Sequence, residues 1–255
     1  MHYLARKTSL RILLLLLGVS LALIVGCNQK KTPLVVYAGK GLKKSMEEIR
    51  LAFEDRHHIP LSIIYAGSDT LLTTIQKSKK GDIFIPGSAP YILELREQVA
   101  AIRPVAKHMP AFLVRADNPK QLRTFADLMA AGVKIAVGNK DMCAIGMVAE
   151  SIIAASEQPE TFRRNIVVTG STVNELLNLV VTGEVDAALA WEDMLQWPEA
   201  KDLQPIAIPD AINAPEEIQI AILASSVNPK HAALFADFVA TEGKASFAKH
   251  GFRVE

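Results

Sequence analysis

Cysteine is almost absent from this chain, and its scarcity excludes several kinds of site. Only two cysteines occur among 255 residues. If Cys27 is modified at its sulfur, as argued below, Cys143 has no partner left for a disulfide. Two cysteines also cannot form the thiolate cage of a structural zinc site. We therefore expect no disulfide, no metal site and no cofactor.

An excess of charge of one sign is absent too, as are common catalytic motifs. The formal net charge is +1, and basic doublets such as Lys79-Lys80 never extend into longer runs. Nucleic acid needs a concentrated positive face, so it is not an expected partner. There is no Gly-x-Ser-x-Gly elbow, Walker loop or His-Glu-x-x-His motif. His108 and His250 have no acidic sequence neighbour that would mark a triad or a metal site, so an enzyme is not expected.

A long apolar run occurs only at the N-terminus, where it spans residues 12–26, follows basic residues and ends at Cys27. A helix needs roughly 20 residues to cross about 30 Å of hydrocarbon, so the run predicts a secretory signal peptide over 1–26. Ile24-Val25-Gly26-Cys27 is similar to the bacterial lipobox, where the chain is cut before the cysteine and its sulfur is lipidated. The alternative is an uncleaved anchor. Both interpretations place the remainder outside the cytoplasm, at the membrane surface.

The rest of the chain has the composition of a packed protein. Half of all residues are apolar and 22% are charged, so a core is expected. Residues 27–33 are predicted to be a polar tether. The length after the signal, 255 − 26 = 229 residues, suits one large domain or two small lobes.

In the first half of the mature chain, short apolar runs alternate with amphipathic ones. They predict strands over 34–38, 61–65 and 82–85, and helices over 42–56, 70–78 and 91–97. This order implies a parallel sheet with helices on its faces. Such sheets bind ligands at the carboxyl ends of their strands, which places loops 39–41, 66–69 and 86–88 on one rim.

The second half repeats this α/β pattern. It predicts strands over 111–114, 134–137, 165–168 and 187–190, and helices over 125–131, 145–156 and 173–182. A strand over 218–223 could return to the first half, followed by a helix over 230–240 and a final segment, 242–250. We therefore expect an α/β fold of two lobes, each a mostly parallel sheet flanked by helices. Lobe 1 would be 34–110 and 220–255, lobe 2 would be 111–219, and the crossover strands would form a hinge.

Two loops that open helices in lobe 1 are the first candidates for a site. A helix N-terminus presents free backbone N–H groups and partial positive charge, so it can bind an anion without a cationic side chain. In loop 39–41, the glycines would let the backbone approach a ligand. In loop 66–69, Ser68 could donate its hydroxyl while Asp69 caps the helix. The alternative for each loop is ordinary turn and capping chemistry.

Lobe 2 offers comparable positions. Residues 141–146 open one helix, and Ser171-Thr172 opens the next, either with backbone donors for a ligand or as a plain cap. Trp191, at the end of a strand, could donate its indole N–H or could be a core aromatic. Cys143 could be a reactive thiol with a lowered pKa at a helix start, or an inert filler.

A family likeness runs from Leu34 to Arg253. It is carried, in order, by residues 36–38, 65–71, 81–85, 134–138, 183–188 and 247–252. The chain resembles the periplasmic molybdate/tungstate-binding proteins of ABC importers, which belong to the type II periplasmic binding proteins. The resemblance implies a substrate-binding lipoprotein that captures a tetrahedral oxyanion between its lobes. Its implied partners are that ligand, a permease with a cytoplasmic ATPase, and the membrane through Cys27; a monomer is expected.

The family holds its oxyanion with hydroxyls and backbone N–H groups from both lobes. Carried over by position, the implied ligand-binding residues are Gly41, Gly67, Ser68, Ile145, Val173 and Trp191. The family serine of the first loop falls at Gly41, so that hydroxyl is absent. The family tyrosine that closes the site falls at Trp191, and a residue that is usually small falls at Ile145. These departures weaken the inference to molybdate in particular.

Alternatives to molybdate or tungstate remain open. Another ligand, such as sulfate, phosphate or a metal-containing species, fits the same fold. If Asp69 or Asp141 points into the cleft, a protonated or metal-containing ligand is favoured, because a carboxylate repels a dianion. A secreted enzyme using Cys143 or a His–Asp pair in the cleft, and a sensor lipoprotein without a permease, are the other hypotheses.

Overall fold

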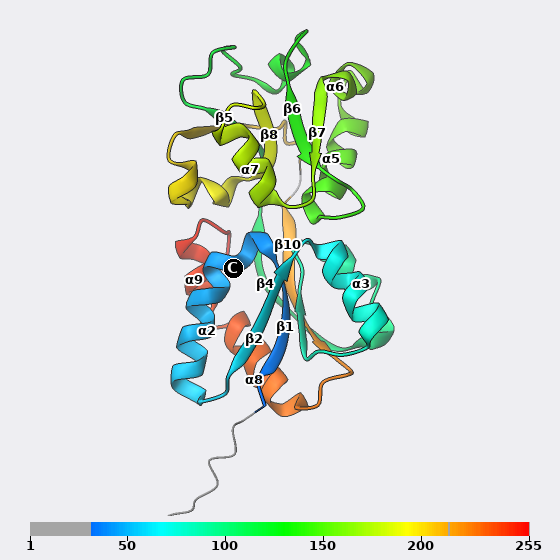
Figure 1. The fold of residues 1–255 in the computed structure, drawn as a ribbon, viewed down its shortest axis with the longest axis vertical. Coiled ribbons are helices and arrows are strands. Elements are labelled where there is room, and N and C mark those ends of the chain that lie inside the picture. The colour runs from blue at the N-terminus through cyan, green and yellow to red at the C-terminus, as the bar shows by residue number, and fades with distance from the viewer. Residues whose placement is uncertain (1–31, 214, 255) are drawn as a thin grey trace, which may run out of the picture. The chain divides into compact units, whose positions relative to one another are not determined.

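The computed structural model describes residues 32–213 and 215–254 (Figure 1). The chain divides into two units, Met1–Thr32 and Pro33–Glu255, and the second unit carries both sheets. The predicted signal peptide and the predicted lipidation site at Cys27 lie outside the described residues. In the part of the chain that is described, no helix has the length and apolar character needed to cross a membrane.

The first sheet has five strands in the order β2-β1-β3-β10-β4. They are β1 (Leu34–Gly39), β2 (Leu61–Ala66), β3 (Ile83–Ile85), β4 (Val99–His108) and β10 (Glu216–Leu223). β1 pairs in parallel with β2 and β3, whereas β10 pairs antiparallel with β3 and β4. The late strand β10 is therefore inserted between two early ones.

Helices cover both faces of the first sheet, and this explains why β1 is apolar almost throughout (Figure 1). The helical elements are η1 (Lys40–Leu42), α2 (Lys43–His57), α3 (Ser68–Ser78), α4 (Pro90–Leu93), η2 (Arg96–Gln98), α8 (Pro229–Ala240) and α9 (Lys244–Lys249). Val36 of β1 lies in one core cluster with Phe53 of α2, whereas Tyr37 lies in another with Leu71 of α3. Successive side chains of a strand point to opposite faces, so both faces must be apolar here.

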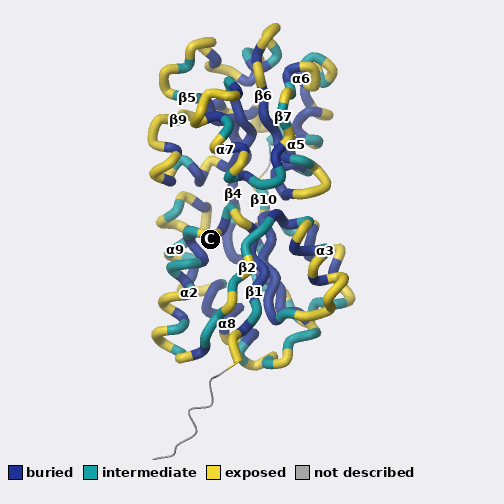
Figure 2. The backbone as a smooth tube through the Cα atoms, in the orientation of Figure 1, coloured by how far each residue is buried: buried dark blue, intermediate teal, exposed yellow. Residues whose placement is uncertain are grey.

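The second sheet has the order β7-β6-β8-β5-β9. Its strands are β5 (Pro110–Arg115), β6 (Ile135–Gly138), β7 (Ile166–Gly170), β8 (Ala187–Trp191) and β9 (Leu203–Ile206). The surrounding helices are η3 (Phe125–Met129), α5 (Ala144–Ala155), α6 (Pro159–Asn165), α7 (Val173–Val181), η4 (Glu192–Gln196) and η5 (Pro198–Ala200). All residues of β6 and β8 are buried, and Figure 2 shows these strands dark blue inside their lobe.

The predicted two-lobe α/β fold is confirmed, with a difference in strand direction. Each sheet is mixed rather than mostly parallel, with two parallel and two antiparallel pairings. The chain enters the second lobe through β5 and re-enters the first through β10. These two strands start where the neighbouring strands end, so they run against them. The lobe boundaries at 110/111 and 219/220 stay a prediction; β10 as observed begins at Glu216.

The strands β4 and β9 and the helix α6 were not predicted, and neither were the short 3-10 helices η4 and η5. β4 is an edge strand with alternating exposure, and its Pro104 cannot donate to the ladder, a residue that argues against a regular strand. The pairing with β10 accommodates it by a register shift between Ile218 and Gln219. The helix predicted over 125–131 is a short 3-10 helix. Asn165, predicted to begin a strand, ends α6, where its buried amide donates to the carbonyl oxygens of Leu128 and Ala130.

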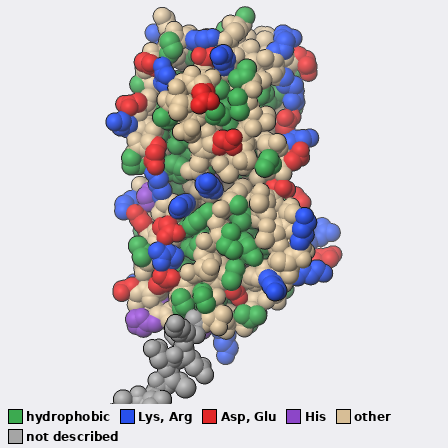
Figure 3. All heavy atoms as spheres, viewed as in Figure 1, with side chains coloured by type: hydrophobic (Ala, Val, Ile, Leu, Met, Phe, Trp, Pro, Cys, Tyr) green, Lys and Arg blue, Asp and Glu red, His purple; other side chains and the backbone are tan. Residues whose placement is uncertain are grey.

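Charged side chains are mixed in sign over the face drawn in Figure 3, where Lys and Arg alternate with Asp and Glu. No concentrated positive surface gathers on this face. The view agrees with a net charge of +1.

Candidate functional site

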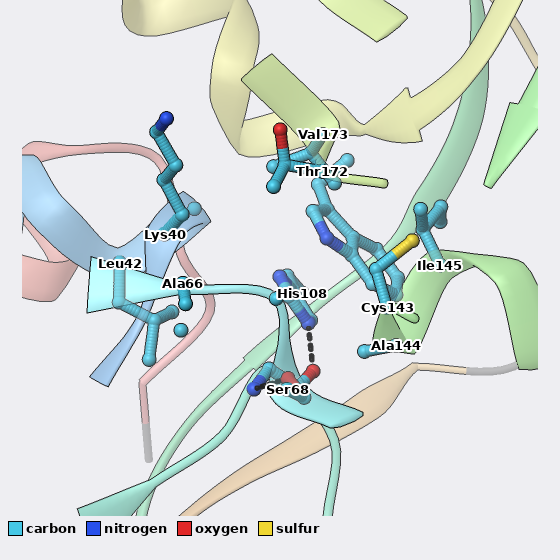
Figure 4. A pocket seen from close by; sticks show the side chains of 15 residues that line it. Lys40, Leu42, Ala66, Ser68, His108, Cys143, Ala144, Ile145, Thr172 and Val173 are labelled. Carbon is cyan, nitrogen blue, oxygen red and sulfur yellow. Dashed lines mark hydrogen bonds between the residues drawn. The ribbon is translucent and has the colours of Figure 1, made fainter. Parts of the chain in front are cut away.

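A small cavity of about 30 Å³ lies where strand ends of both sheets meet. Residues of the first lobe that line it are Gly39, Lys40, Gly41, Leu42, Ala66, Gly67, Ser68, Gly87 and His108. Residues of the second lobe that line it are Cys143, Ala144, Ile145, Thr172, Val173 and Trp191. Figure 4 shows these side chains around one space. The cavity therefore draws on both lobes.

All six residues inferred from the resemblance line this cavity: Gly41, Gly67, Ser68, Ile145, Val173 and Trp191. The two carboxylates that would repel a dianion, Asp69 and Asp141, are not among the lining residues. The structure thus brings together residues from five separate stretches of sequence. Sequence reasoning placed Gly87 and Ala144 only within the wider segments 86–88 and 141–146, and it did not propose His108 as a ligand-binding residue.

Four helix starts form most of the wall. The N-cap residues of η1, α3, α5 and α7 are Gly39, Gly67, Cys143 and Thr172, and each lines the cavity. The first N–H groups of a helix have no acceptor within it and carry the positive end of its dipole. The wall is therefore rich in backbone donors aimed at one space.

Side chains leave most of these donors uncapped. At α7, Thr172 accepts a hydrogen bond from the N–H of Glu175 at 3.3 Å, so of the two interpretations of this helix start the structure shows the plain cap. No side-chain capping bond occurs at η1, α3 or α5. The prediction that Asp69 caps α3 is wrong, because the helix already begins at Ser68 and Asp69 lies inside its first turn.

Ser68 is buried, and its hydroxyl position is fixed by the loop after β3. Its Oγ accepts a hydrogen bond from the N–H of Gly87 at 3.1 Å. A hydroxyl has one hydrogen to donate in addition to its lone pairs. The hydrogen of Ser68 is therefore available to an acceptor in the cavity, as the prediction for this residue requires.

The lobes approach each other closely beside the cavity. A Cβ added at Gly67 would lie 2.4 Å from the carbonyl oxygen of Met142 and 2.9 Å from that of Ser171. Lys44 forms an ion pair with Glu199 of the other lobe at 2.6 Å. These contacts describe a closed arrangement in which glycine at position 67 permits backbone to meet backbone.

The lining offers little formal charge. Lys40 is exposed, and Figure 4 shows its side chain extending away from Ser68 and His108. No Asp or Glu lines the cavity. Cys143 is neutral, because burial raises the pKa of its thiol to about 11. Its Sγ donates weakly to the carbonyl oxygens of Asn139 and Gly170, which supports an inert filler over a reactive thiol.

His108 and Trp191 form one side of the cavity together. Their rings stack with centroids 3.6 Å apart and planes at 17°. The His108 Nε2 lies 2.8 Å from the carbonyl oxygen of Gly87, and its Nδ1 lies 3.5 Å from Oδ1 of Asp193. Trp191 is both buried and part of the lining, so its two interpretations are not exclusive.

The partner of His108 is distant in sequence, which is why the histidine seemed isolated. Asp193 lies 85 positions later, by 193 − 108, and no local pattern connects the two residues. Burial raises the pKa of the Asp193 carboxyl. His108 has no acidic neighbour in the sequence, as noted above, but in the folded protein the Asp193 carboxyl lies beside its ring.

Comparison with known proteins gives consistent results. The family described as bacterial extracellular solute-binding protein matches residues 34–253. A candidate binding protein of Haemophilus influenzae is 28% identical over 93% of this chain and 97% of its own length. The molybdate-binding protein ModA of Mycobacterium tuberculosis is 26% identical over 89% of this chain and 87% of its own. Among solved structures, the sulfate-binding protein SubI of Mycobacterium tuberculosis has a TM-score of 0.76 at 18% identity, covering 88% of each chain.

Proposed function

The chain belongs to the bacterial extracellular solute-binding protein family, and we propose that it captures a small tetrahedral oxyanion for an ABC importer. Molybdate or tungstate is the first candidate, and sulfate is the main alternative. The observation that carries the proposal is the convergence of four helix N-termini on one small cavity.

The wall chemistry favours an anion. Burying an unpaired charge is costly, so a desolvated anion needs hydrogen-bond donors in place of water. Hydrogen bonds to an ionised acceptor are about twice as strong as neutral ones. Uncapped helix N–H groups and the Ser68 hydroxyl supply such donors, while no carboxylate lines the space. A metal cation would meet donors here rather than acceptors.

The cavity size favours a free inorganic ion. A water molecule needs roughly 10–15 Å³ of this kind of volume. A cavity of about 30 Å³ therefore has room for a compact group only. A sugar phosphate or another organic anion of many atoms would require the lobes to open.

Molybdate ranks first because of the relatives and because of where two carboxylates lie. A sequence relative is a molybdate-binding protein, and Asp69 and Asp141 do not line the cavity. Gly41, Ile145 and Trp191 depart from the family pattern, which keeps sulfate in consideration. A protein of the same fold is sulfate-binding, so the fold alone does not choose between the two ions.

Closure would couple capture to transport. The ligand would bridge N–H groups of both lobes and so stabilise the closed state, with bending at the crossover strands β4–β5 and β10. The closed protein would then deliver its ligand to a permease driven by a cytoplasmic ATPase. Lipidation at Cys27 would hold the monomeric protein at the outer face of the membrane.

The enzyme hypothesis gains little from this geometry. The Cys143 thiol is neutral and already donates to carbonyl oxygens. His108 cannot accept a proton at Nε2 while that atom donates to the carbonyl oxygen of Gly87. Cys143→Ala should therefore leave binding intact and abolish no activity.

The direct test is calorimetric titration of residues 28–255, stripped of ligand by unfolding and refolding. Molybdate, tungstate, sulfate and phosphate would be titrated separately. Binding at 1:1 with submicromolar Kd for molybdate or tungstate, and much weaker sulfate binding, is the expected result. Bound ligand at a thousandfold excess over Kd should add about 4 kcal/mol of stability. If none of the four anions binds, the oxyanion proposal is wrong.

A further inference from the structure

Two buried titratable groups meet at one wall of the cavity. His108 and Asp193 are each 2% exposed, and Nδ1 of the histidine lies 3.5 Å from Oδ1 of the aspartate. Neither Nδ1 nor either carboxylate oxygen has a hydrogen bond of good geometry to any other group of the described chain. Buried polar groups are normally hydrogen-bonded, so this pair calls for an explanation.

The histidine tautomer follows from its other nitrogen. Nε2 lies 2.8 Å from the carbonyl oxygen of Gly87, and a carbonyl oxygen only accepts. Nε2 therefore carries hydrogen, which leaves Nδ1 with a lone pair unless the ring is protonated. A lone pair facing an ionised carboxylate in a buried site is repulsive. One proton must therefore lie between His108 and Asp193.

This shared proton sets the charge of the pair. With the proton on Asp193 both groups are neutral, and with the proton on His108 they form an ion pair; the net charge is zero in both states. Without the proton the net charge is −1. The ring of His108 lines the cavity whereas Asp193 does not, so an anion would draw the proton toward the ring. Charges interact strongly in such a poorly solvated place.

Other charged groups around the pair are engaged elsewhere. Glu192 adjoins Asp193, helps to raise its pKa, and lies 3.5 Å from Arg253. The backbone of Arg253 pairs with that of Lys107, the neighbour of His108 on β4, while its guanidinium faces Glu192. Glu216, opposite His108 on β10, accepts a hydrogen bond from the Ser88 hydroxyl at 2.7 Å.

On the remaining side, across the cavity, the Cys143 thiol has a pKa raised to about 11 and stays neutral. Of the groups that line the cavity or touch its lining directly, His108 and Asp193 are therefore the two whose geometry requires a shared proton.

We propose that His108 and Asp193 select the ligand by charge: the cavity accepts a dianion while the pair holds its shared proton and rejects it once that proton is lost. The inference rests on the proposed oxyanion function and adds two residues to the site. The sign follows from the charge of the pair. Deprotonation leaves −1 beside the ligand, so affinity falls as pH rises.

The test measures molybdate binding calorimetrically between about pH 6 and about pH 9, where molybdate keeps both charges. One linked proton predicts a Kd that rises up to tenfold per pH unit above the titration of the pair. Titrations in buffers with different ionisation heats should also show proton uptake on binding. A neutral amide cannot lose such a proton, so Asp193→Asn should flatten the pH profile and abolish the uptake.

Two further variants separate charge from structure. His108→Gln keeps an N–H for the carbonyl oxygen of Gly87 but removes the ring that shares the proton, so it should shift the profile along the pH axis. Asp69→Asn removes a carboxylate that does not line the cavity and should keep the wild-type slope. Thermal unfolding verifies that each variant is folded.

The outcomes distinguish the two proposals. Molybdate binding that is independent of pH in the wild type, or a slope that persists in Asp193→Asn, or one that His108→Gln leaves in place on the pH axis, overturns the role of the pair while the oxyanion function stands. If molybdate fails and sulfate binds, the same series is run with sulfate. If no anion binds at any pH, both proposals fall.

Discussion

The two lobes contribute to the cavity in different ways. The first lobe supplies glycines at 41 and 67 and uncapped helix starts. It also supplies the Ser68 hydroxyl, whose oxygen is held in place by a hydrogen bond from the N–H of Gly87. The second lobe supplies one uncapped helix start, that of α5, and more bulk, with Ile145 and Trp191 almost fully buried in the wall. In its loop before α7, the polar atoms of Ser171 are already hydrogen-bonded within the lobe, because the Glu175 carboxylate accepts from both the N–H and the hydroxyl of Ser171.

This difference suggests a division of tasks. Glycine and free donors let the first lobe approach and bond the anion, whereas the large side chains of the second lobe fix how much space remains. Changes in the first lobe should then alter affinity for every anion. Changes in the second should alter the preference among anions of different size.

The largest effect is expected from Gly67→Ala. The added Cβ would lie 2.4 Å from a backbone carbonyl oxygen of the second lobe, which a side-chain rotation cannot relieve. Gly67 has φ −61°, which alanine adopts freely, so the first lobe should fold normally. Overpacking costs about 1–3 kcal/mol, so Kd should rise by up to about 100-fold for each anion.

Gly41→Ala is the graded control for that change. Its Cβ would meet Cγ2 of Val173 at 3.1 Å, the end of a side chain that can shift. The rise in Kd should therefore stay below about tenfold, roughly 1 kcal/mol. Equal effects at positions 41 and 67, measured by calorimetry with thermal unfolding of the free protein, would contradict closure against the Met142 carbonyl.

Ser68→Ala should give the next largest effect. A hydrogen bond to a charged group contributes about 1.5–3 kcal/mol, so losing this donor should weaken binding roughly 10- to 100-fold. The N–H of Gly87 also loses its acceptor, so a small drop in melting temperature is expected. Ser62→Ala, an exposed serine on β2, should change neither quantity. An unchanged Kd in Ser68→Ala would remove the hydroxyl from the site.

The positions of these first-lobe residues could be predicted from the sequence, because they depend on patterns of neighbouring residues. Gly41, Gly67 and Ser68 follow apolar strands and precede amphipathic helices, and the order of elements places their loops at one edge of a sheet. Both loops indeed line the cavity. Their ligand contacts remain predictions, since sequence gives position but not the direction of a hydroxyl.

Features that depend on residues far apart in the sequence could not be predicted: the pairing of β4, the partner of His108 and the direction of two strands. β4 escaped prediction because Pro104 breaks its pattern and its pairing with β10 is set more than a hundred residues later. His108 ends that strand, and its partner Asp193 comes from the other lobe. The direction of β5 and β10 depends on where the chain crosses between lobes, which composition and periodicity do not encode.

Ile145→Val tests the role of the second lobe. Removing one methylene from a buried wall costs about 0.5–1.5 kcal/mol of folding stability and enlarges the cavity slightly. Sulfate is smaller than molybdate and should lose more affinity in the enlarged cavity. The Kd for sulfate divided by the Kd for molybdate should therefore rise by a few-fold. Ile152→Val, buried on the same helix but outside the lining, should match the stability loss without changing the ratio. A proportional loss for both anions would assign size selection elsewhere.

The smallest effect should come from the ion pair that joins the lobes outside the cavity. Lys44 bonds Glu199 at 2.6 Å and lies over the Trp197 ring, but the glutamate side chain is 61% exposed. Exposed pairs contribute about 0–1 kcal/mol, so Lys44→Gln should raise Kd less than about fivefold and remove part of its salt dependence. Lys201→Gln, which changes an exposed lysine of the second lobe, is the control.

The pH dependence of this ion pair has the opposite sign to that of His108 and Asp193. The hydrogen bond from Lys44 lowers the pKa of Glu199, so the pair persists above the usual glutamate range and is lost as pH falls through the lowered value. Lys44→Gln should therefore raise Kd by the same small factor at every pH above about 6, which leaves the slope there unchanged, and its difference from the wild type should vanish in acid. A changed slope at higher pH would mean that closure itself, rather than the buried proton, controls the response.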